Sequence, residues 1–181
     1  MSFELIVGPM FSGKTDELIR RLAAADAAGL RVATAKPSVD EADPGWIVSL
    51  SGARRPAVSA GSAEALVELA AGHDVLGVDE IEFFEPEIVA AVVALAAGCR
   101  VVAAGLDLDF RGEPFGPMPE LAKLADGVTV LTATCAVCGG VATRSQRLLD
   151  GQPAPREAAI VQIGGRELYE PRCAQHHVVP S

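Results

Sequence analysis

The amino-acid sequence predicts an α/β fold built on a mainly parallel sheet, with helices on both of its faces. Short apolar runs alternate with segments whose apolar residues recur at helical spacing, which is typical of βαβ units. Apolar residues make up 50% of the 181 positions and charged residues 22%, a composition typical of globular proteins. From residue 132 onward the alternation ends, and Cys, Gly, Pro and Arg become frequent. We therefore expect an α/β domain over residues 1–131 and a small second domain over residues 132–181.

The strands of the predicted sheet are short apolar runs, each of the length expected for a buried parallel strand. The first is stopped by Gly8, and the third ends in Asp79-Glu80. None approaches the ~18 uninterrupted apolar residues that are needed to span a bilayer, so no membrane association is expected. In chain order the predicted strands cover residues 3–7, 31–35, 75–78, 101–104 and 128–131.

The helices are predicted where apolar side chains recur every three or four residues. The first follows Thr15 and ends near Gly29, because glycine commonly terminates a helix. Between residues 36 and 62, Pro and Gly are frequent and no period is evident, which indicates a loop or a short hairpin. The apolar stripes are Leu18, Ile19 and Leu22; Ala63, Leu66, Val67 and Ala70; Ile88, Val89, Val92, Val93 and Ala96; and Leu121 with Leu124.

The charge balance restricts the ligand. There are 15 Lys and Arg residues against 24 Asp and Glu residues, which gives a formal net charge of −9. Polynucleotide binding requires a basic surface, so a polynucleotide is not expected as a partner, whereas a single nucleotide needs only local positive potential. The amino-terminal residues lack the basic region of a signal peptide, and we expect a cytoplasmic protein.

Residues 8–15 read GPMFSGKT and match the phosphate-binding pattern G-x-x-x-x-G-K-[ST]. The motif follows a predicted strand and precedes a predicted helix, an order that an unrelated Gly-rich turn would lack. Backbone N–H groups of such a loop point at phosphate oxygens, and the helix N-terminus adds favourable potential. We expect Lys14 to reach the β- and γ-phosphates of ATP and Thr15 to hold Mg²⁺. The loop residues expected at ATP are Gly8, Pro9, Met10, Phe11, Ser12, Gly13, Lys14 and Thr15.

Acidic residues follow the third predicted strand. Ligands of open α/β sheets bind at the carboxyl ends of strands, so Asp79 is expected to orient Mg²⁺ or its waters. Glu80 is the candidate general base, which would accept a proton from the attacking hydroxyl or water. Because Glu82 and Glu85 lie nearby, the alternative is a solvated acidic turn. The presence of Lys14 favours the functional interpretation.

Two pairs of potential metal ligands occur in the second predicted domain. Cys135 and Cys138 form C-x-x-C, and Cys173 and His176 form C-x-x-H, a spacing that suits tetrahedral Zn²⁺. Four protein ligands leave no open position, so the zinc would be structural. A redox pair is the alternative, but Cys135 does not begin a helix after a βαβ strand. His177 could replace His176, and the sequence leaves both open.

Most of the aromatic residues lie in or near these motifs. That distribution favours aromatic walls around a flat ligand such as a nucleobase. The same residues would equally suit an anchoring role for loops at the ends of the sheet. They are Phe11, Phe83, Phe84, Phe110, Phe115 and Tyr169.

Three segments resemble the type II thymidine kinase family: GPMFSGKT at residues 8–15, DEIEFF at 79–84 and GLDLDFRGEPFGPM at 105–118. The paired zinc turns, Arg147-Leu148 and residues 164–169 extend the resemblance over nearly the whole chain. It implies a RecA-like P-loop NTPase core and a small zinc-binding domain whose loop, the lasso, closes over thymidine. It also implies transfer of the γ-phosphate of ATP, with Mg²⁺, to the thymidine 5′-hydroxyl, in a homotetramer that serves pyrimidine salvage.

The resemblance assigns residues by motif position, and Glu80 matches the family's general base. Beside ATP it adds Asp79, Glu80, Ile81 and Glu82 to the loop residues. The nucleoside contacts it implies are Phe110, Ile160, Val161, Gln162, Ile163, Gly164 and Tyr169. Those implied around the base are Met10, Phe83, Leu106 and Phe115.

Two departures from the family stand out. Glu82 occupies a position where the family usually has Gln. Residues 37–59 lie outside the resemblance: Asp40-Glu41-Ala42-Asp43 stands where the family has an Arg-Tyr pair, and Arg54 and Arg55 are candidates to substitute for it.

Two other functions fit the same motifs. The first is a small P-loop nucleotide kinase with a zinc-bearing lid, which would act on a monophosphate. The second is a zinc-ribbon sensor or adaptor that binds thymidine nucleotides without turnover.

Overall fold

The computed structural model describes residues 2–40 and 43–181, so Glu41 and Ala42 of the divergent acidic segment lie outside the described residues. A six-stranded sheet forms the centre, in the order β5-β2-β6-β7-β1-β8. All of its pairings are parallel, which confirms the predicted α/β class. Its strands are β1 (Phe3–Val7), β2 (Val32–Pro37), β5 (Val58–Ala60), β6 (Val75–Val78), β7 (Arg100–Gly105) and β8 (Gly127–Val130).

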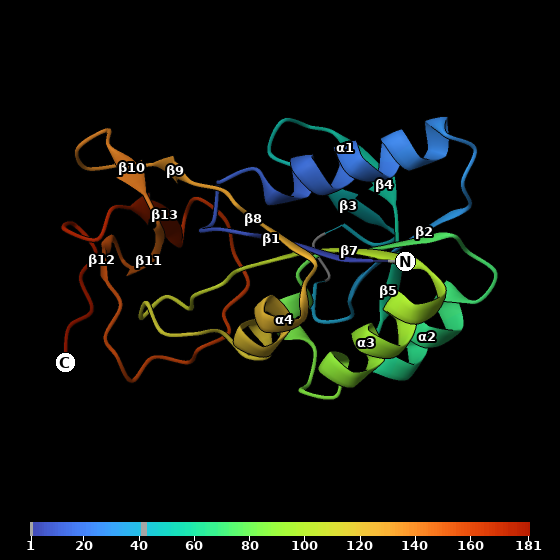
Figure 1. Ribbon diagram of the computed structural model, residues 1–181. Helices are drawn as coiled ribbons and strands as arrows, with labels where there is room; N and C mark the ends of the chain where they lie inside the picture. The colour runs from blue at the N-terminus through green and yellow to red at the C-terminus, as the bar shows by residue number, and fades with distance from the viewer. Residues whose placement is uncertain (1, 41–42) are drawn as a thin grey trace.

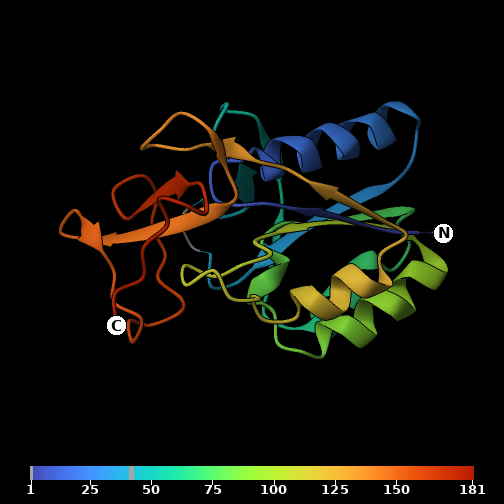
Figure 2. The same cartoon turned by 60° about the vertical axis from the view of Figure 1, so that its left-hand side comes forward.

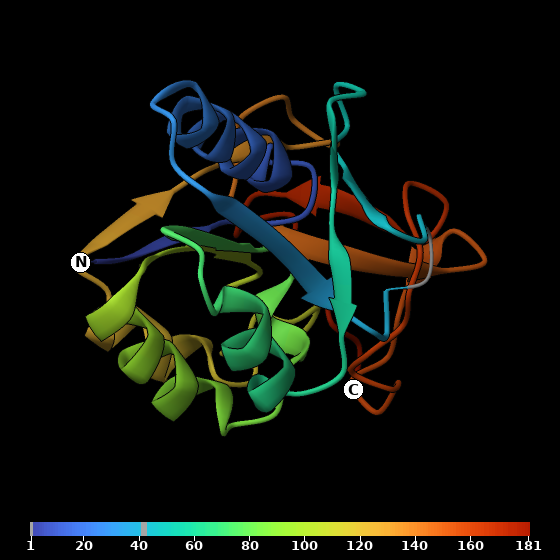
Figure 3. The same ribbon diagram turned by 90° about the vertical axis from the view of Figure 1, so that its right-hand side faces the viewer.

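Helices cover both faces of this sheet, as predicted. Helix α1 (Lys14–Ala27) lies on one face, and α2 (Ala63–Ala70), α3 (Ile88–Gly98) and α4 (Met118–Leu124) lie on the other (Figures 1 and 3). Successive side chains of β1 point to opposite faces, so Leu5 packs in the cluster under α2, α3 and α4, while Ile6 packs in the cluster under α1. The apolar core therefore has two layers, one on each side of the sheet.

A glycine in the centre of the sheet sets how closely α1 approaches it. A Cβ atom on Gly77 of β6 would overlap the Leu22 side chain of α1. Leu22 is fully buried, and its side chain occupies the space that the missing Cβ leaves. The absence of a side chain at Gly77 therefore allows the helix that begins in the phosphate-binding motif to pack directly on β6.

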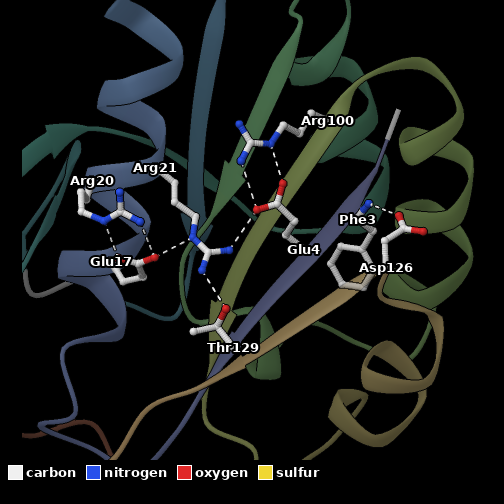
Figure 4. Close-up of polar contacts among 8 residues, drawn as sticks. All are labelled: Phe3, Glu4, Glu17, Arg20, Arg21, Arg100, Asp126 and Thr129. Atoms are coloured by element: carbon white, nitrogen blue, oxygen red, sulfur yellow. Dashed lines mark hydrogen bonds and ion pairs between the residues drawn. The ribbon is translucent and has the colours of Figure 1, made fainter.

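A polar network ties α1 to three strands (Figure 4). Glu4 of β1 accepts hydrogen bonds from Arg100 of β7 at 2.6 Å and from Arg21 of α1 at 2.9 Å. Arg21 also donates to Thr129 of β8 at 2.7 Å and to Glu17 one helical turn earlier at 2.8 Å. The hydrogen bond from Arg100 is the main reason that the pKa of Glu4 is lowered.

The described residues between 36 and 62 include a short hairpin, which was one of the two predicted alternatives, and one strand that was not predicted. Strand β3 (Trp46–Val48) pairs antiparallel with β4 (Arg54–Pro56), and Arg54 stacks on the Trp46 ring at 4.2 Å. Strand β5 is only three residues long and adds a parallel edge to β2. Three residues are too few to show a period, so the pairing depends on the exposed edge of β2 and not on a local pattern.

The residues that follow β8 form short antiparallel strands at one end of the parallel sheet (Figure 2). They are β9 (Ala133–Thr134), β10 (Val141–Ala142), β11 (Arg144–Leu149), β12 (Gln152–Pro153) and β13 (Tyr169–Arg172). The change of texture at residue 132 thus falls just after the last parallel strand, although the domain boundary itself stays a prediction. In the part of the chain that the structure describes, no helix has the length and apolar character needed to cross a bilayer.

Candidate active site

The phosphate-binding motif forms the connection between β1 and α1. Gly13 caps the helix with φ of 86°, and Gly8 has φ of 150°, where a Cβ atom would overlap the Leu131 carbonyl oxygen. Both glycines therefore allow a backbone path that other residues rarely adopt. The Lys14 ammonium donates to the Pro9 carbonyl at 2.9 Å, so the lysine side chain folds back over the loop.

The acidic residues follow β6, which lies between β2 and β7 in the centre of the sheet. Asp79 and Glu82 are buried. Burial raises the pKa of Asp79 to about 6, although the Thr15 hydroxyl and Lys14 oppose the shift. Burial also raises the pKa of Glu80 well above its usual range, and the neighbouring Glu82 and Asp79 add to it. Such burial argues against a solvated acidic turn.

Glu82 occupies an unusual position among these carboxyl groups. Its side chain is 4% exposed, and its Oε2 atom is buried without a hydrogen-bond partner among the described residues. A Cβ atom on Gly105, at the end of β7, would lie 2.5 Å from that oxygen. Burial raises the pKa of Glu82 to about 7, against the effect of Lys14. The glycine therefore makes room for a carboxyl group at the floor of the site.

A cavity of about 320 Å³ lies at the carboxyl ends of the parallel strands. It brings together residues from the phosphate-binding loop, the acidic turn, the 105–118 segment and the irregular loop between β12 and β13, residues 154–168, which we call the lasso loop. Of the predicted site residues, its lining contains Met10, Phe11, Gly13, Lys14, Thr15, Asp79, Glu80, Glu82, Phe83, Leu106, Phe110, Phe115, Ile160, Val161, Gln162, Ile163, Gly164 and Tyr169.

Of the residues predicted to bind ATP or the nucleoside, four do not line this cavity. Gly8, Pro9 and Ser12 belong to the phosphate-binding loop, and the Ser12 hydroxyl oxygen is buried there without a partner among the described residues. Ile81 is fully buried in the apolar cluster under α2, α3 and α4. Its side chain therefore anchors the acidic turn to the core, beneath the carboxyl groups.

The structure divides the aromatic residues between the wall of the cavity and the apolar core. Phe83 and Phe115 meet edge to face, with ring centroids 5.5 Å apart, on the wall of the cavity. Phe110 and Tyr169 line the same cavity, and both rings lie close to the Arg147 guanidinium group. Phe84 instead packs into the apolar core, so it anchors the turn that follows Glu80.

The cavity also includes residues that were not expected there. Val48 and Leu50 come from the hairpin region, Ser145 and Arg147 from β11, and Asp40 from the loop after β2. The Ser145 hydroxyl accepts a hydrogen bond from the Met10 amide at 2.9 Å and so joins β11 to the phosphate-binding loop. No local pattern in residues 36–62 distinguishes Val48 or Leu50 from other apolar loop residues.

The two arginines considered as substitutes in the divergent segment do not reach the site. Arg54 stacks on Trp46, and Arg55 donates to Thr34 at 2.7 Å and pairs with Asp26. Neither lines the cavity. In the described part of the segment, these side chains stabilise the hairpin and hold it against β2 and α1.

Three cysteines and one histidine form a candidate metal site. One ligand atom from each of Cys135, Cys138, Cys173 and His176 lies within 4.8 Å of the other three. The Cys173 sulfur and the His176 Nδ1 atom are 3.1 Å apart. Three sulfurs and one imidazole nitrogen in such a cluster suit tetrahedral Zn²⁺, so the donor set fits that ion.

The neighbouring histidine has a different contact. His177 Nε2 donates to the Phe110 carbonyl oxygen at 2.8 Å. The structure therefore places His176, and not His177, in the candidate cluster, although the identity of the fourth zinc ligand stays a prediction. Because the two histidines are adjacent, the candidate metal site is linked directly to the wall of the cavity.

Comparison with known proteins agrees with this arrangement. A family model described as thymidine kinase matches residues 1–177. The curated thymidine kinase of Thermococcus kodakarensis (strain ATCC BAA-918 / JCM 12380 / KOD1) is 45% identical over 185 aligned residues, which cover 98% of this chain and 94% of that protein. A match over this length spans the phosphate-binding loop, the acidic turn and the candidate metal site, and we conclude that the chain belongs to the thymidine kinase family.

Proposed function

We propose that this protein transfers the γ-phosphate of ATP to the 5′-hydroxyl of thymidine, producing dTMP and ADP. The observation that carries the proposal is the composition of the cavity. A phosphate-binding loop, a buried acidic turn and an aromatic wall under the lasso loop all line one space of about 320 Å³. Such a space suits a nucleoside that meets the terminal phosphate of ATP in line.

The ATP side of this proposal depends on the loop between β1 and α1. Its backbone amides and Lys14 would bind the phosphates, with Asp79 to Glu82 beside them. Thr15 and Asp79 are the residues we propose to hold Mg²⁺, which would neutralise charge on the phosphates. Their fit is supported by the position of both residues on the wall of the cavity and by the effect of the Thr15 hydroxyl, which opposes the rise in the pKa of the buried Asp79 carboxyl group.

We propose Glu80 as the general base. It would accept the proton of the 5′-hydroxyl as the oxygen forms its bond to the γ-phosphorus and the bond from that phosphorus to ADP breaks. A base must lie close to the hydroxyl and have a pKa that is high enough to take the proton. Burial and the neighbouring Glu82 and Asp79 raise the pKa of Glu80, which supports this role.

The nucleoside would lie between the aromatic wall and the lasso loop. We propose that Met10, Phe83, Leu106 and Phe115 surround the base. Closure by Ile160 to Gly164, with Phe110 and Tyr169, would exclude water, which would otherwise accept the phosphate. The side chains of Ile160, Val161 and Ile163 are exposed although they are apolar. Their exposure supports a role of this loop in covering a bound nucleoside.

The second part of the chain is proposed to be a separate unit. We propose that residues 132–181 form a small domain that a structural Zn²⁺ stabilises through Cys135, Cys138, Cys173 and His176.

We also propose a cytoplasmic homotetramer, on the basis of the family resemblance. Light scattering on the purified protein tests the mass of this assembly. With a net charge of −9, no polynucleotide is proposed as a partner.

The experiment that tests the function measures ADP release from ATP in the presence of thymidine, of thymidine monophosphate, and of neither. We expect release that depends on thymidine. Release that depends only on the monophosphate would identify a nucleotide kinase. Thymidine binding without ADP release would identify a sensor or adaptor, and either outcome would contradict the proposal.

A further inference from the structure

The guanidinium group of Arg147 lies beneath the lasso loop and is 1% exposed. It projects from β11 and lines the cavity, yet it forms no ion pair with any carboxylate of the described residues. A buried cation without a counter-ion is costly unless polar groups surround it. The polar groups that surround the Arg147 guanidinium therefore indicate the role of its positive charge.

Carbonyl oxygens of the lasso loop provide those polar groups. The Nη2 atom of Arg147 donates to the Ile160 carbonyl at 2.6 Å, and the Nη1 atom donates to the Ala159 carbonyl. The Nε and Nη2 atoms donate to the Tyr169 hydroxyl at 2.9 and 2.6 Å. That hydroxyl donates in turn to the Gln162 carbonyl at 2.7 Å. One side chain thus holds three carbonyl groups of the loop, directly or through Tyr169.

Two aromatic rings hold the guanidinium group in place. Its central carbon lies 4.2 Å from the ring centroid of Phe110 and 5.2 Å from that of Tyr169. Phe110 is itself held by the hydrogen bond from His177 to its carbonyl oxygen. A planar fork of donors stacked on aromatic rings is specific to arginine, because the lysine ammonium is a compact point charge.

We propose that Arg147 is a positioning residue that sets the backbone of residues 159–162 in the shape that receives the nucleoside. The lasso loop has no helix or strand of its own in the described structure, so its carbonyl groups depend on donors from elsewhere. An ordered loop spares the nucleoside the cost of ordering it on binding. This inference rests on the proposed function, because it assigns the loop to the nucleoside and not to ATP.

The test compares Arg147→Lys, Arg147→Met and the matched control Arg144→Lys. Arg144 lies on the same strand, donates to Thr143 and does not line the cavity. For each protein we would measure KM for thymidine, KM for ATP and kcat. We would also follow hydrogen exchange of the lasso amides in the ligand-free protein.

We expect both Arg147 variants to raise KM for thymidine by about tenfold or more, because the nucleoside must then order the loop. KM for ATP should stay within about twofold, which a general loss of structure would not allow. Exchange of the amides of residues 159–163 should become about tenfold faster. Arg144→Lys should match the wild type in every measurement.

Unchanged thymidine KM and unchanged exchange in Arg147→Met would overturn the proposal. Wild-type behaviour of Arg147→Lys would also overturn it, because a charge without the fork would then suffice. If Arg147→Met does not fold, Tyr169→Phe decides, since it removes only the hydroxyl between Arg147 and Gln162; it should raise thymidine KM and speed exchange. Wild-type protein that does not phosphorylate thymidine refutes the proposed function, while exchange in the ligand-free variants still decides the role of Arg147.

Discussion

At the scale of single residues, two residues that line the cavity have a positive φ, a backbone conformation that residues other than glycine rarely adopt. Phe11 of the phosphate-binding loop has φ of 65°, and Glu80 has φ of 51°. Such conformations cost on the order of 1–3 kcal/mol and are concentrated at functional sites, where the surrounding structure holds them. Glu80 lies two residues after the end of β6 and caps the short 3₁₀ helix Ile81–Phe83 of the acidic turn. The strain therefore occurs at the residue that we propose as the base.

Replacement of that carboxyl group tests its role. We expect Glu80→Gln to lower kcat by about 10²–10⁴-fold, because an amide cannot accept the proton of the 5′-hydroxyl. Thymidine and ATP binding, followed by calorimetry, should survive, since glutamine has nearly the same shape. Wild-type turnover in Glu80→Gln would remove this residue from the role of base.

Glu82 calls for a separate test, because it is a carboxyl group where the family usually has an amide. We expect Glu82→Gln to keep or increase kcat. The amide would keep the volume beside Gly105 and remove an acidic group that influences both Lys14 and Glu80. Steady-state turnover and thermal unfolding, measured on the same preparation, check this. A large loss of turnover in a stable variant would show that the Glu82 carboxyl group has its own function.

At the scale of elements, the packing of α1 on β6 allows a sharp test. We expect Gly77→Ala to lower the free energy of unfolding by about 1–3 kcal/mol, because the new methyl group overlaps Leu22 in a filled core. Gly98→Ala is the matched control. Gly98 ends α3 with open space around it, so alanine there should leave stability unchanged or raise it slightly. Urea unfolding of both variants measures the difference, and equal stabilities would contradict close packing of α1 on β6.

The ion pairs of α1 predict how stability changes with acid. The hydrogen bond from Arg20 is the main reason that the pKa of Glu17 falls from 4.5 to about 2 in the folded protein. A lowered folded-state pKa means that the contribution is complete above the unfolded value and is lost as the pH falls toward the folded value. Glu17→Gln should therefore be less stable than the wild type at pH 6, and the difference should vanish near pH 2. Denaturant midpoints across this range check the trend; a difference that does not depend on pH would contradict it.

At the scale of the whole molecule, the antiparallel strands after residue 132 are short and depend on contacts beyond their own pairing. β9, β10 and β12 have two residues each, which is too little for independent stability. Hydrogen bonds from His177 to Phe110 and from Met10 to Ser145 connect this region to the parallel core. We propose that the candidate metal cluster and these contacts together hold the lasso loop over the cavity.

Metal analysis tests that arrangement. We expect about one zinc per chain, because three sulfurs and one imidazole nitrogen within 4.8 Å of one another can supply the four ligands of a closed tetrahedral site. Removal of the metal, or Cys138→Ser, should abolish thymidine binding while the parallel core still binds ATP, since the phosphate-binding loop lies between β1 and α1. Calorimetry with each ligand separates the two effects. A folded, active protein without metal would contradict the assignment.

Much of the fold could be predicted because its signals are local. The strand, loop and helix of the phosphate-binding motif are contiguous in the chain, and the glycines at 8 and 13 fit the curled loop between them. Apolar runs predicted β1 and β6 with the bounds that the structure has. Because ligands of open α/β sheets bind at the carboxyl ends of parallel strands, the phosphate-binding motif and the acidic turn were predicted to lie at the same edge of the sheet. These inferences need only the alternation of elements and the handedness of their connections.

The sequence by itself determined the α/β class, the phosphate-binding loop, the acidic turn and the C-x-x-C and C-x-x-H pairs of the candidate metal site, because each of these motifs consists of residues close together along the chain. Only the tertiary structure decided the placement of His176, and not His177, in the candidate cluster, the pairing of β5, the entry of Val48 and Leu50 into the cavity, and the position of Arg147 beneath the lasso loop. Each of these depends on contacts between residues far apart in the chain. Such contacts follow from how the sheet, the hairpin and the zinc-ligand region pack together, which no local pattern of residues specifies.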